Sequence, residues 1–202
     1  MAANECFLDS STLRENVVAL ARNIGYVPRS RKAARAKISF TVSGLEDTST
    51  LTLNAGLICN GAGQNTNYIF SIPEDITVPV TNGVANFSQI QISEGTYVTE
   101  SFTVDTSLAS QKYILDNSFI DTSTIKVKVF PSESSSSSVT YQQIDNIVGV
   151  TSTASSYLLQ EIEDERYELI FGDNVIGKKL SNDNFIDVSY IVTDGRDGNG
   201  AS

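Results

Sequence analysis

The chain has 202 residues, of which 40% are hydrophobic, and its formal net charge is −10. That length is enough to bury a core in one domain or in two small ones. The sequence has no histidine and no apolar run near the ~20 residues of a membrane helix. It therefore excludes Ser-His and Cys-His catalysis and predicts a protein that does not insert into membranes.

The charge is distributed unevenly along the chain. Residues 1–37 carry seven Lys or Arg and three Asp or Glu, a net charge of +4, whereas residues 38–202 carry −14. An acidic body repels phosphate, which argues against a nucleic-acid binder. A basic head suits docking against an acidic body, as in an assembly component.

The two cysteines, Cys6 and Cys59, belong to no Cys-x-x-Cys pair. A structural zinc site needs about four ligands, so none is expected. We expect two free thiols, with a single Cys6–Cys59 bridge as the alternative.

Residues 12–25 are predicted to form an amphipathic α-helix. Thr12 and Glu15 match a capping box, and Gly25 is a natural helix terminator. The apolar residues recur at helical spacing and form one stripe, whose candidate interface members are Leu13, Val17, Leu20 and Ile24. The stripe packs either in the core or against a helix of another subunit.

Residues 29–37, called the basic strap below, follow the predicted helix. Its candidate interface residues are Arg29, Arg31, Lys32 and Arg35. No aromatic residue lies among these cations to stack on a base, which weakens a nucleic-acid role. The strap is therefore either solvated or part of a protein interface.

The chain from residue 38 onward shows the alternation of β-strands. Short apolar-polar runs are expected as strands at 38–42, 51–53, 68–70, 76–78, 84–92, 97–104 and 125–129. Two hairpins are predicted, one joining 125–130 to 139–144 through a serine-rich tip, the other joining 158–160 to 167–171. The sequence thus predicts a mainly β fold, an antiparallel sandwich or barrel-like sheets, with an N-terminal amphipathic α-helix. Its expected parts are 1–37, a β-rich subdomain 38–108 and a β-rich subdomain 109–202, truncated at its C-terminus.

Two runs near the end of the chain, 167–177 and 185–200, predict strands joined by a tight glycine-rich connection. We expect a hairpin whose structural turn contains Gly172, Asp173 and Gly177. Residues 172–178 also match the first seven positions of a phosphate-binding loop, but Lys179 replaces the required Ser or Thr and no helix pattern follows. The run 194–200 partly matches a calcium-binding loop, but Arg196 stands at a position that requires an oxygen ligand.

A group of acidic residues between 161 and 168 lies at a predicted hairpin crest, where carboxylates are usually solvated. Acid-base catalysis by paired carboxylates requires burial that splits their pKa values, and nothing in the pattern predicts it. No catalytic residue, cofactor, metal ion or small-molecule substrate is expected.

Several motifs resemble the baseplate J-like family of phage tail proteins. The runs that carry the resemblance are 7–28, Tyr157–Glu161, Phe171–Asp173, Gly177–Lys178 and Gly198–Gly200. Asn174 stands where the family usually has glycine, a change that a left-handed turn tolerates. Residues 44–110 match least specifically.

The resemblance implies a wedge subunit of a contractile-tail baseplate, located in the virion and assembled in the host cytoplasm. Its expected partners are itself, as a homodimer or ring closing around the hub, and other wedge proteins. The alternative from another class is a carbohydrate- or host-binding β-sandwich of a tail fibre or adhesin. The lack of tryptophan weakens it, because such sites usually expose aromatic rings for sugar stacking. An enzyme is the least favoured reading.

Overall fold

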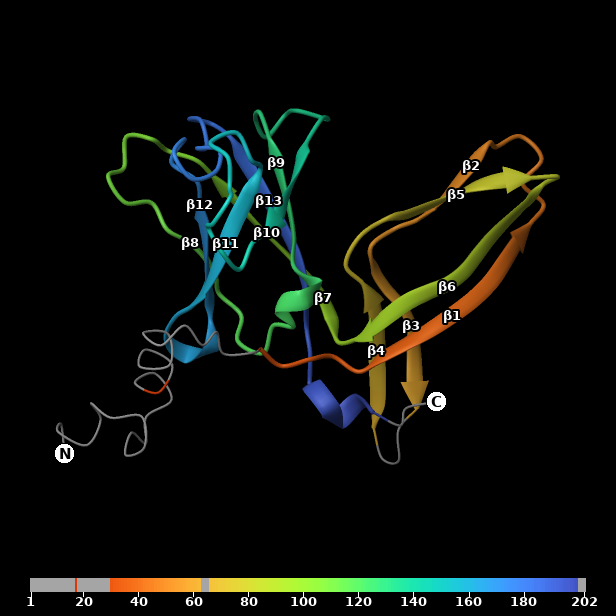
Figure 1. Cartoon of the computed structure of the whole chain (residues 1–202). Helices are drawn as coiled ribbons and strands as arrows, with labels where there is room; N and C mark the ends of the chain where they lie inside the picture. Colours follow the sequence, from red (N-terminus) through yellow and green to blue (C-terminus); the bar gives the residue numbers. More distant parts are fainter. Residues whose placement is uncertain (1–16, 18–29, 63–65, 200–202) are drawn as a thin grey trace.

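The computed structural model of the chain describes residues 17, 30–62 and 66–199 and shows two β-sheets (Figure 1). The helix expected at 12–25 lies outside these residues, apart from the single position Val17. In 30–62 and 66–199 the helical elements are 3-10 turns of three or four residues: η2 (Thr122–Thr124), η3 (Glu163–Glu165) and η4 (Gly195–Gly198). The mainly β prediction is confirmed, and the N-terminal helix is not supported.

The first sheet has six strands. They are β1 (Arg35–Ser43), β2 (Thr50–Leu53), β3 (Gly56–Ala62), β4 (Asn67–Ile72), β5 (Ile76–Thr81) and β6 (Val84–Glu94). The order is β2-β5-β6-β4-β3, and β1 pairs with β6 along its whole length. Because β5 and β4 each pair only with one end of β6, the sheet forks into a β2–β5 branch and a β3–β4 branch (Figure 1).

The core of the first sheet is thin. Six buried hydrophobic residues form it, and twelve further apolar residues around it are only partly buried. Phe40 of β1 stacks on Phe87 of β6 with ring centroids 4.8 Å apart. The period-two alternation predicted from the sequence is visible in β1, where Ile38, Phe40 and Val42 are half-buried and their neighbours exposed.

The second sheet has seven strands. They are β7 (Thr96–Thr103), β8 (Tyr113–Leu115), β9 (Lys126–Phe130), β10 (Val139–Gln143), β11 (Ser156–Glu161), β12 (Tyr167–Phe171) and β13 (Phe185–Val192). The order is β7-β13-β9-β10-β11-β12-β8. All neighbours are antiparallel except β10 and β11, so the antiparallel expectation fails for that one pair. The predicted division into subdomains at 108/109 stays a prediction. Strand β7 precedes that boundary in the sequence but belongs to the second sheet.

The hairpin predictions had different outcomes. The β9–β10 and β11–β12 hairpins are confirmed by their antiparallel registers. The hairpin expected between 167–171 and 185–192 is wrong, because β9, β10 and β11 lie between β12 and β13 in the sheet. Both strands have buried apolar side chains, and each pairs with two other strands. Strands β3 and β8 were not predicted; β3 contains two glycines and β8 only three residues.

The outer strands of the second sheet, β7 and β8, are joined by side chains. Gln111 donates to the carbonyl of Thr103 and accepts from the amide of Asp105, at 2.7 and 2.8 Å. The rings of Phe102 and Tyr113 meet edge to face, with centroids 5.7 Å apart. These contacts almost close the sheet into a barrel around a core of fifteen buried residues.

The two sheets meet at a bonded junction. Glu94, at the end of β6, is buried and accepts a 2.5 Å hydrogen bond from the hydroxyl of Thr193. The hydroxyl of Ser189 donates to the carbonyl of Pro73, and Lys126 pairs with Glu74 at 3.0 Å. Strand β7 follows β6 after the single residue Gly95, so the covalent connection is also short.

Candidate interaction surface

The basic strap is anchored to the second sheet by Asp121. This carboxylate is fully buried and accepts hydrogen bonds from the amide of Ala33 at 3.0 Å and from Arg35 at 3.4 Å. Its other oxygen accepts from the amide and hydroxyl of Ser123, so Asp121 is the N-cap of η2. Arg35 also donates to the Ser123 hydroxyl at 2.5 Å. One buried carboxylate thus fixes the path of the strap into β1.

Arg31 is held at a second point. Its guanidinium lies 3.8 Å from the ring centroid of Phe119, a cation–π geometry, and its Nε is 4.0 Å from a carboxylate oxygen of Glu165. Ser30 and Thr122 share a 2.7 Å hydroxyl contact. The strap therefore lies along η2 and η3 at one end of the second sheet.

The predicted interface residues fall into three groups. Arg31 and Arg35 are exposed and also contact other parts of the same chain, and a role for them in a partner interface stays a prediction. Lys32 is exposed and forms no ion pair among the described residues. The remaining members, Leu13, Leu20, Ile24 and Arg29, lie outside the described residues, and Val17 is half-buried.

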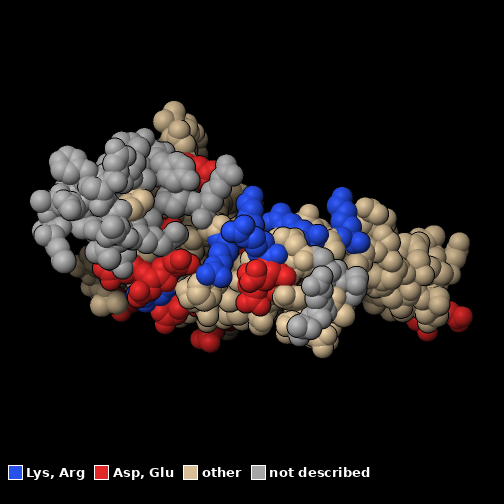
Figure 2. Space-filling model, turned by 90° about the horizontal axis from the view of Figure 1, so that it is seen from below, with Lys and Arg blue, Asp and Glu red and all other residues tan. Residues whose placement is uncertain are grey.

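Basic side chains gather on the face of the molecule that carries the strap (Figure 2). The exposed cations there include Lys32, Arg35 and Lys37, and acidic residues of η3 lie beside the strap through the Arg31–Glu165 contact. From residue 38 to residue 111 the sequence contains no Lys or Arg. The first sheet consequently has no positive charge beyond Lys37.

Sequence reasoning missed Asp121. The signal was present, because Asp-Thr-Ser is a pattern in which aspartate accepts from the amide two residues on. What the pattern did not reveal is the contact with Ala33 and Arg35, which are more than 80 positions away.

The glycine-rich connection is a compact turn between β12 and the loop leading to β13. Asp173 accepts from the amides of Val175 and Ile176, both at 2.9 Å, and these bonds lower the pKa of its carboxyl. Gly177 has φ +80, the left-handed region. A Cβ at Gly172 would lie 2.2 Å from the carbonyl carbon of Gly177, so close backbone approach requires glycine there. The amides that a phosphate-binding loop would offer to its ligand are therefore already bonded within the protein, as are those of Asn174 and Gly177.

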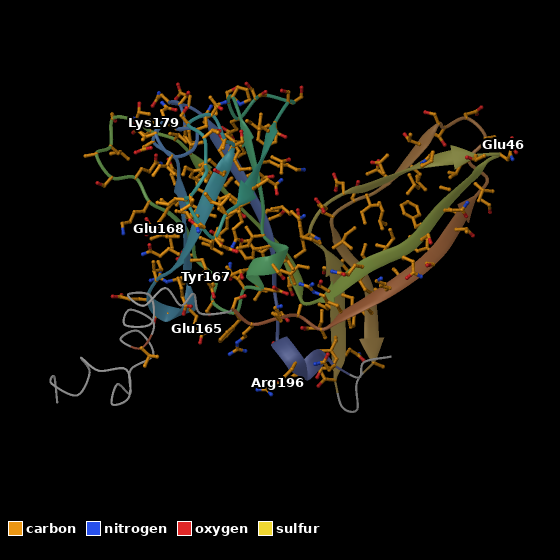
Figure 3. The ribbon with its side chains drawn as sticks, in the orientation of Figure 1. Glu46, Glu165, Tyr167, Glu168, Lys179 and Arg196 are labelled. Carbon is orange, nitrogen blue, oxygen red and sulfur yellow. The ribbon has the colours of Figure 1, made fainter. Side chains whose placement is uncertain are left out.

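A pocket of about 310 Å³ lies beside this turn, between β12 and the 104–111 segment. Tyr113, Glu168 and Lys179 line it, and Lys179 and Glu168 are labelled in Figure 3. Burial raises the pKa of the Tyr113 phenol, whose hydroxyl donates to Gln111 at 3.1 Å. Glu168 pairs with Lys112 at 3.5 Å. Tyr113 and Glu168 thus pair with residues other than the pocket groups named here, and no contact in the described part of the chain joins Tyr113, Glu168 and Lys179 into a nucleophile–base couple.

The acidic crest combines exposed and buried groups. Glu163 and Asp164 are exposed, as expected, whereas Glu161 is buried.

Within the described ranges, no group of three or more His, Cys, Asp or Glu is placed to hold a metal ion. Cys59 is a free, partly buried thiol. Over the same ranges we find no helix of the length and apolarity required to span a bilayer.

Comparison with known proteins gives a distant relative. No family model matches the sequence. The chain is similar to the baseplate wedge protein gp6 of Enterobacteria phage T4, with 25% identity over 218 residues. The alignment covers 99% of this chain and 32% of that protein, so the chain spans about a third of the length of its relative. The similarity therefore extends along almost the whole chain, but the sequence identity is low.

Proposed function

We propose that this chain is a structural part of a phage tail baseplate, within the wedge that joins neighbouring subunits. The observation that carries the proposal is the similarity to a baseplate wedge protein along 99% of the chain. The baseplate of the virion is then its location, and assembly in the host cytoplasm is part of the proposal. Closure of the wedges into a ring around a hub is the finer role that we assign to it.

The geometry of the strap supports an assembly role. Asp121 and Phe119 hold Arg35 and Arg31, so the strap has a defined path before any partner binds. Preorganisation of this kind lowers the ordering cost of association. Lys32, exposed on the same segment, is free to contact an acidic neighbour.

Two further elements of the proposal come from the sequence alone. The apolar stripe of residues 12–25 docks on another wedge subunit, because a fourteen-residue helix is marginal without a packing surface. The chain is divided into a head at 1–37 and two β-rich subdomains, which lets the head contact one neighbour and the body another.

The direct test is co-assembly with the other wedge proteins of the same phage. We expect the purified chain to co-sediment with at least one of them and to lose this association as salt is raised, since screening acts over about 8–10 Å. A chain that binds none of these proteins, but binds host glycans, would contradict the structural role and favour the adhesin alternative.

A charge variant sharpens this test. Arg29→Ser with Lys32→Ser removes two cations and leaves the Asp121 contacts intact. Exposed ion pairs contribute about 0.2–1 kcal/mol each, so the association should weaken by ~2- to 30-fold. The matched control is Lys178→Ser with Lys179→Ser, which makes the same charge change at the other end of the second sheet. Equal weakening by both pairs would show that only net charge matters.

A further inference from the structure

One edge of strand β1 carries no partner strand. The strand pairs with β6 from Arg35 to Ser43, and no other described strand pairs with it. The carbonyl of Ala34 accepts a 2.8 Å hydrogen bond from the Glu94 amide, at the end of β6. Because backbone groups alternate in direction along a strand, the even-numbered residues of β1 face β6. The residues whose amides and carbonyls face away from β6 are Arg35, Lys37, Ser39, Thr41 and Ser43.

Other strand edges of the molecule are shorter, interrupted or joined to one another. Strand β2 has only four residues, and the register of β3 shifts between Leu57 and Cys59. Strands β7 and β8 are connected through Gln111. The register of β1 also shifts once, between Ile38 and Phe40, but the extra residue there belongs to β6. The edge of β1 is therefore continuous, and such an edge is a template for another strand.

The edge of β1 is basic at its start and uncharged beyond. Arg35 and Lys37 are exposed, and residues 38–45 contain no charged side chain. Figure 2 shows the face of the molecule on which these cations lie. Arg35 already pairs with Asp121, whereas Lys37 forms no ion pair among the described residues. A lysine can keep other strands away from an edge, but this one protects only the start of β1.

One face of β1 is incompletely covered. Ile38, Phe40 and Val42 are half-buried and pack against the thin core of the first sheet. A strand added beside β1 would place every second side chain next to these three and cover them further. The added strand therefore needs apolar residues at alternate positions.

We propose that the free edge of β1 binds an extended segment of a different protein, antiparallel to β1, with apolar residues at alternate positions and a carboxylate level with Lys37. In this mode of recognition main-chain hydrogen bonds give affinity, and the side chains select the partner. The antiparallel direction follows the first sheet, in which all paired strands are antiparallel.

A second copy of β1 does not meet these requirements. The strand ends at Ser43, Gly44 has φ +82, and the Leu45 amide bonds into the β5–β6 turn at 3.1 Å. The chain thus leaves the line of β1 before the next carboxylate, that of Glu46. Because β1 contains no acidic residue to lie level with Lys37, charge complementarity favours a different protein.

A synthetic peptide is the probe for this edge. It has nine residues, alternating Thr and Val, with Glu in place of Thr at its seventh and ninth positions. In the antiparallel register the seventh residue lies opposite Lys37 and the ninth opposite Arg35. Fluorescence anisotropy of the labelled peptide with the 202-residue chain should show saturable binding. Exchange of both Glu for Lys should weaken binding by ~3- to 30-fold. Equal binding of the two peptides, or binding of neither, would overturn the proposal.

A charge reversal in the protein tests the register. Lys37→Glu should weaken binding of the Glu peptide by ~2- to 30-fold and strengthen binding of the Lys peptide, because one attraction and one repulsion are exchanged. The matched control is Lys178→Glu, which makes the same charge change on the second sheet and should keep the wild-type preference. If both variants shift the preference equally, the peptide senses net charge and the proposed register is wrong.

N-methylation of the peptide tests strand pairing without altering the protein. Amides at odd positions of the peptide face β1, and those at even positions face solvent. Methylation at the fifth residue should abolish binding, whereas methylation at the fourth should preserve it. Equal effects of the two modifications would show that the peptide does not bind as a strand.

Hydrogen exchange locates the bound peptide and identifies the wrong occupant. The amides of Lys37, Ser39 and Thr41 should gain protection when the Glu peptide is added. Protection that appears without peptide, as the chain is concentrated, would mean that a second copy occupies the edge and would overturn the choice of partner. The inference goes beyond the proposed function and does not depend on it. A chain that binds no peptide but still co-sediments with wedge proteins would overturn this inference and leave the structural function standing.

Discussion

The two sheets of this molecule differ in what happens to their outermost strands. The second sheet joins its outer strands β7 and β8 through Gln111 and through the Phe102–Tyr113 rings, and surrounds fifteen buried residues. The first sheet is forked, leaves β1 unpaired on one side among the described strands, and has six buried hydrophobic residues. The nearly closed second sheet has the dense core of a stable unit. The first sheet keeps an exposed strand edge, to which another strand can pair.

The difference teaches how stability and binding can be separated within one chain. A dense core excludes water from the inner face of its strands, which gives stability, and the joined outer strands leave few backbone groups unpaired. A forked sheet gives up burial and keeps backbone groups available. The following substitutions test this contrast, each with a counterpart in the other sheet.

The largest expected difference comes from equal truncations in the two cores. Leu169→Ala in β12 removes a side chain that is 1% exposed and should lower the free energy of unfolding by about 3 kcal/mol. Leu51→Ala in β2, where the side chain is half-buried, should cost about 1 kcal/mol. Denaturant unfolding of both variants measures the difference. Equal losses would show that the first sheet is as tightly packed as the second.

A smaller difference is expected from glycine substitutions in the two sheets. Gly172→Ala forces a Cβ to within 2.2 Å of Gly177 and should destabilise the chain by about 2–3 kcal/mol. Gly44→Ala has φ +82 but open space around it, so only backbone strain of about 1 kcal/mol is expected. Thermal melts of the two variants give the comparison. A tolerated Gly172→Ala would mean that the turn relaxes easily.

Closure of the second sheet can be opened selectively. Gln111→Leu removes the bonds to Thr103 and Asp105 and should cost about 1–2 kcal/mol. Thr52→Val removes the exposed 2.8 Å hydroxyl contact with Thr77 in the open sheet and should cost less than about 0.5 kcal/mol. We expect hydrogen exchange in Gln111→Leu to be faster than in the wild type in β7 and β8 and unchanged in β9. Uniform exchange would argue against a local closing role.

The smallest expected effect concerns pH at the junction. Burial raises the pKa of the Glu94 carboxyl above its ordinary value of 4.5, and the charge of Asp194 adds to this, while the Thr193 hydrogen bond opposes it. Because the folded chain then binds this proton more tightly than the unfolded chain, the contribution is favourable below about pH 4.5 and is lost as pH rises through the folded pKa.

Replacement of Glu94 isolates this contribution. Glu94→Gln should flatten the part of the stability–pH curve just above pH 4.5, with a gain of less than about 1 kcal/mol at pH 7. Unfolding curves at several pH values test the slope. A variant with the wild-type slope would assign that pH dependence to other groups.

Much of the strand content was predictable from the sequence, and the pairing of strands was not. Alternation located β1, β6 and β7 within a few residues, because a half-buried strand shows its burial pattern locally. The β9–β10 and β11–β12 hairpins were predictable for the same reason, since the paired strands adjoin in sequence. Strand β8 was missed because three residues are too few to show a period.

The candidate surface shows the same division. The cations of the strap and the glycines of the turn were identified from sequence. Asp121 was not, because its importance comes from burial beneath a segment more than 80 residues away. Gly172 and Gly177 were expected to need either positive φ or close backbone approach, and the structure shows close approach at Gly172 and positive φ at Gly177.

The sequence by itself determined the β-rich class, the segregation of charge, and the tight turn near residue 172. Each of these follows from residues close together in the chain. Only the tertiary structure decided that β12 and β13 lie apart, that Asp121 anchors the strap, and that β1 keeps a free edge. Those features depend on which distant strands share a core, and local preference contains no information about that choice.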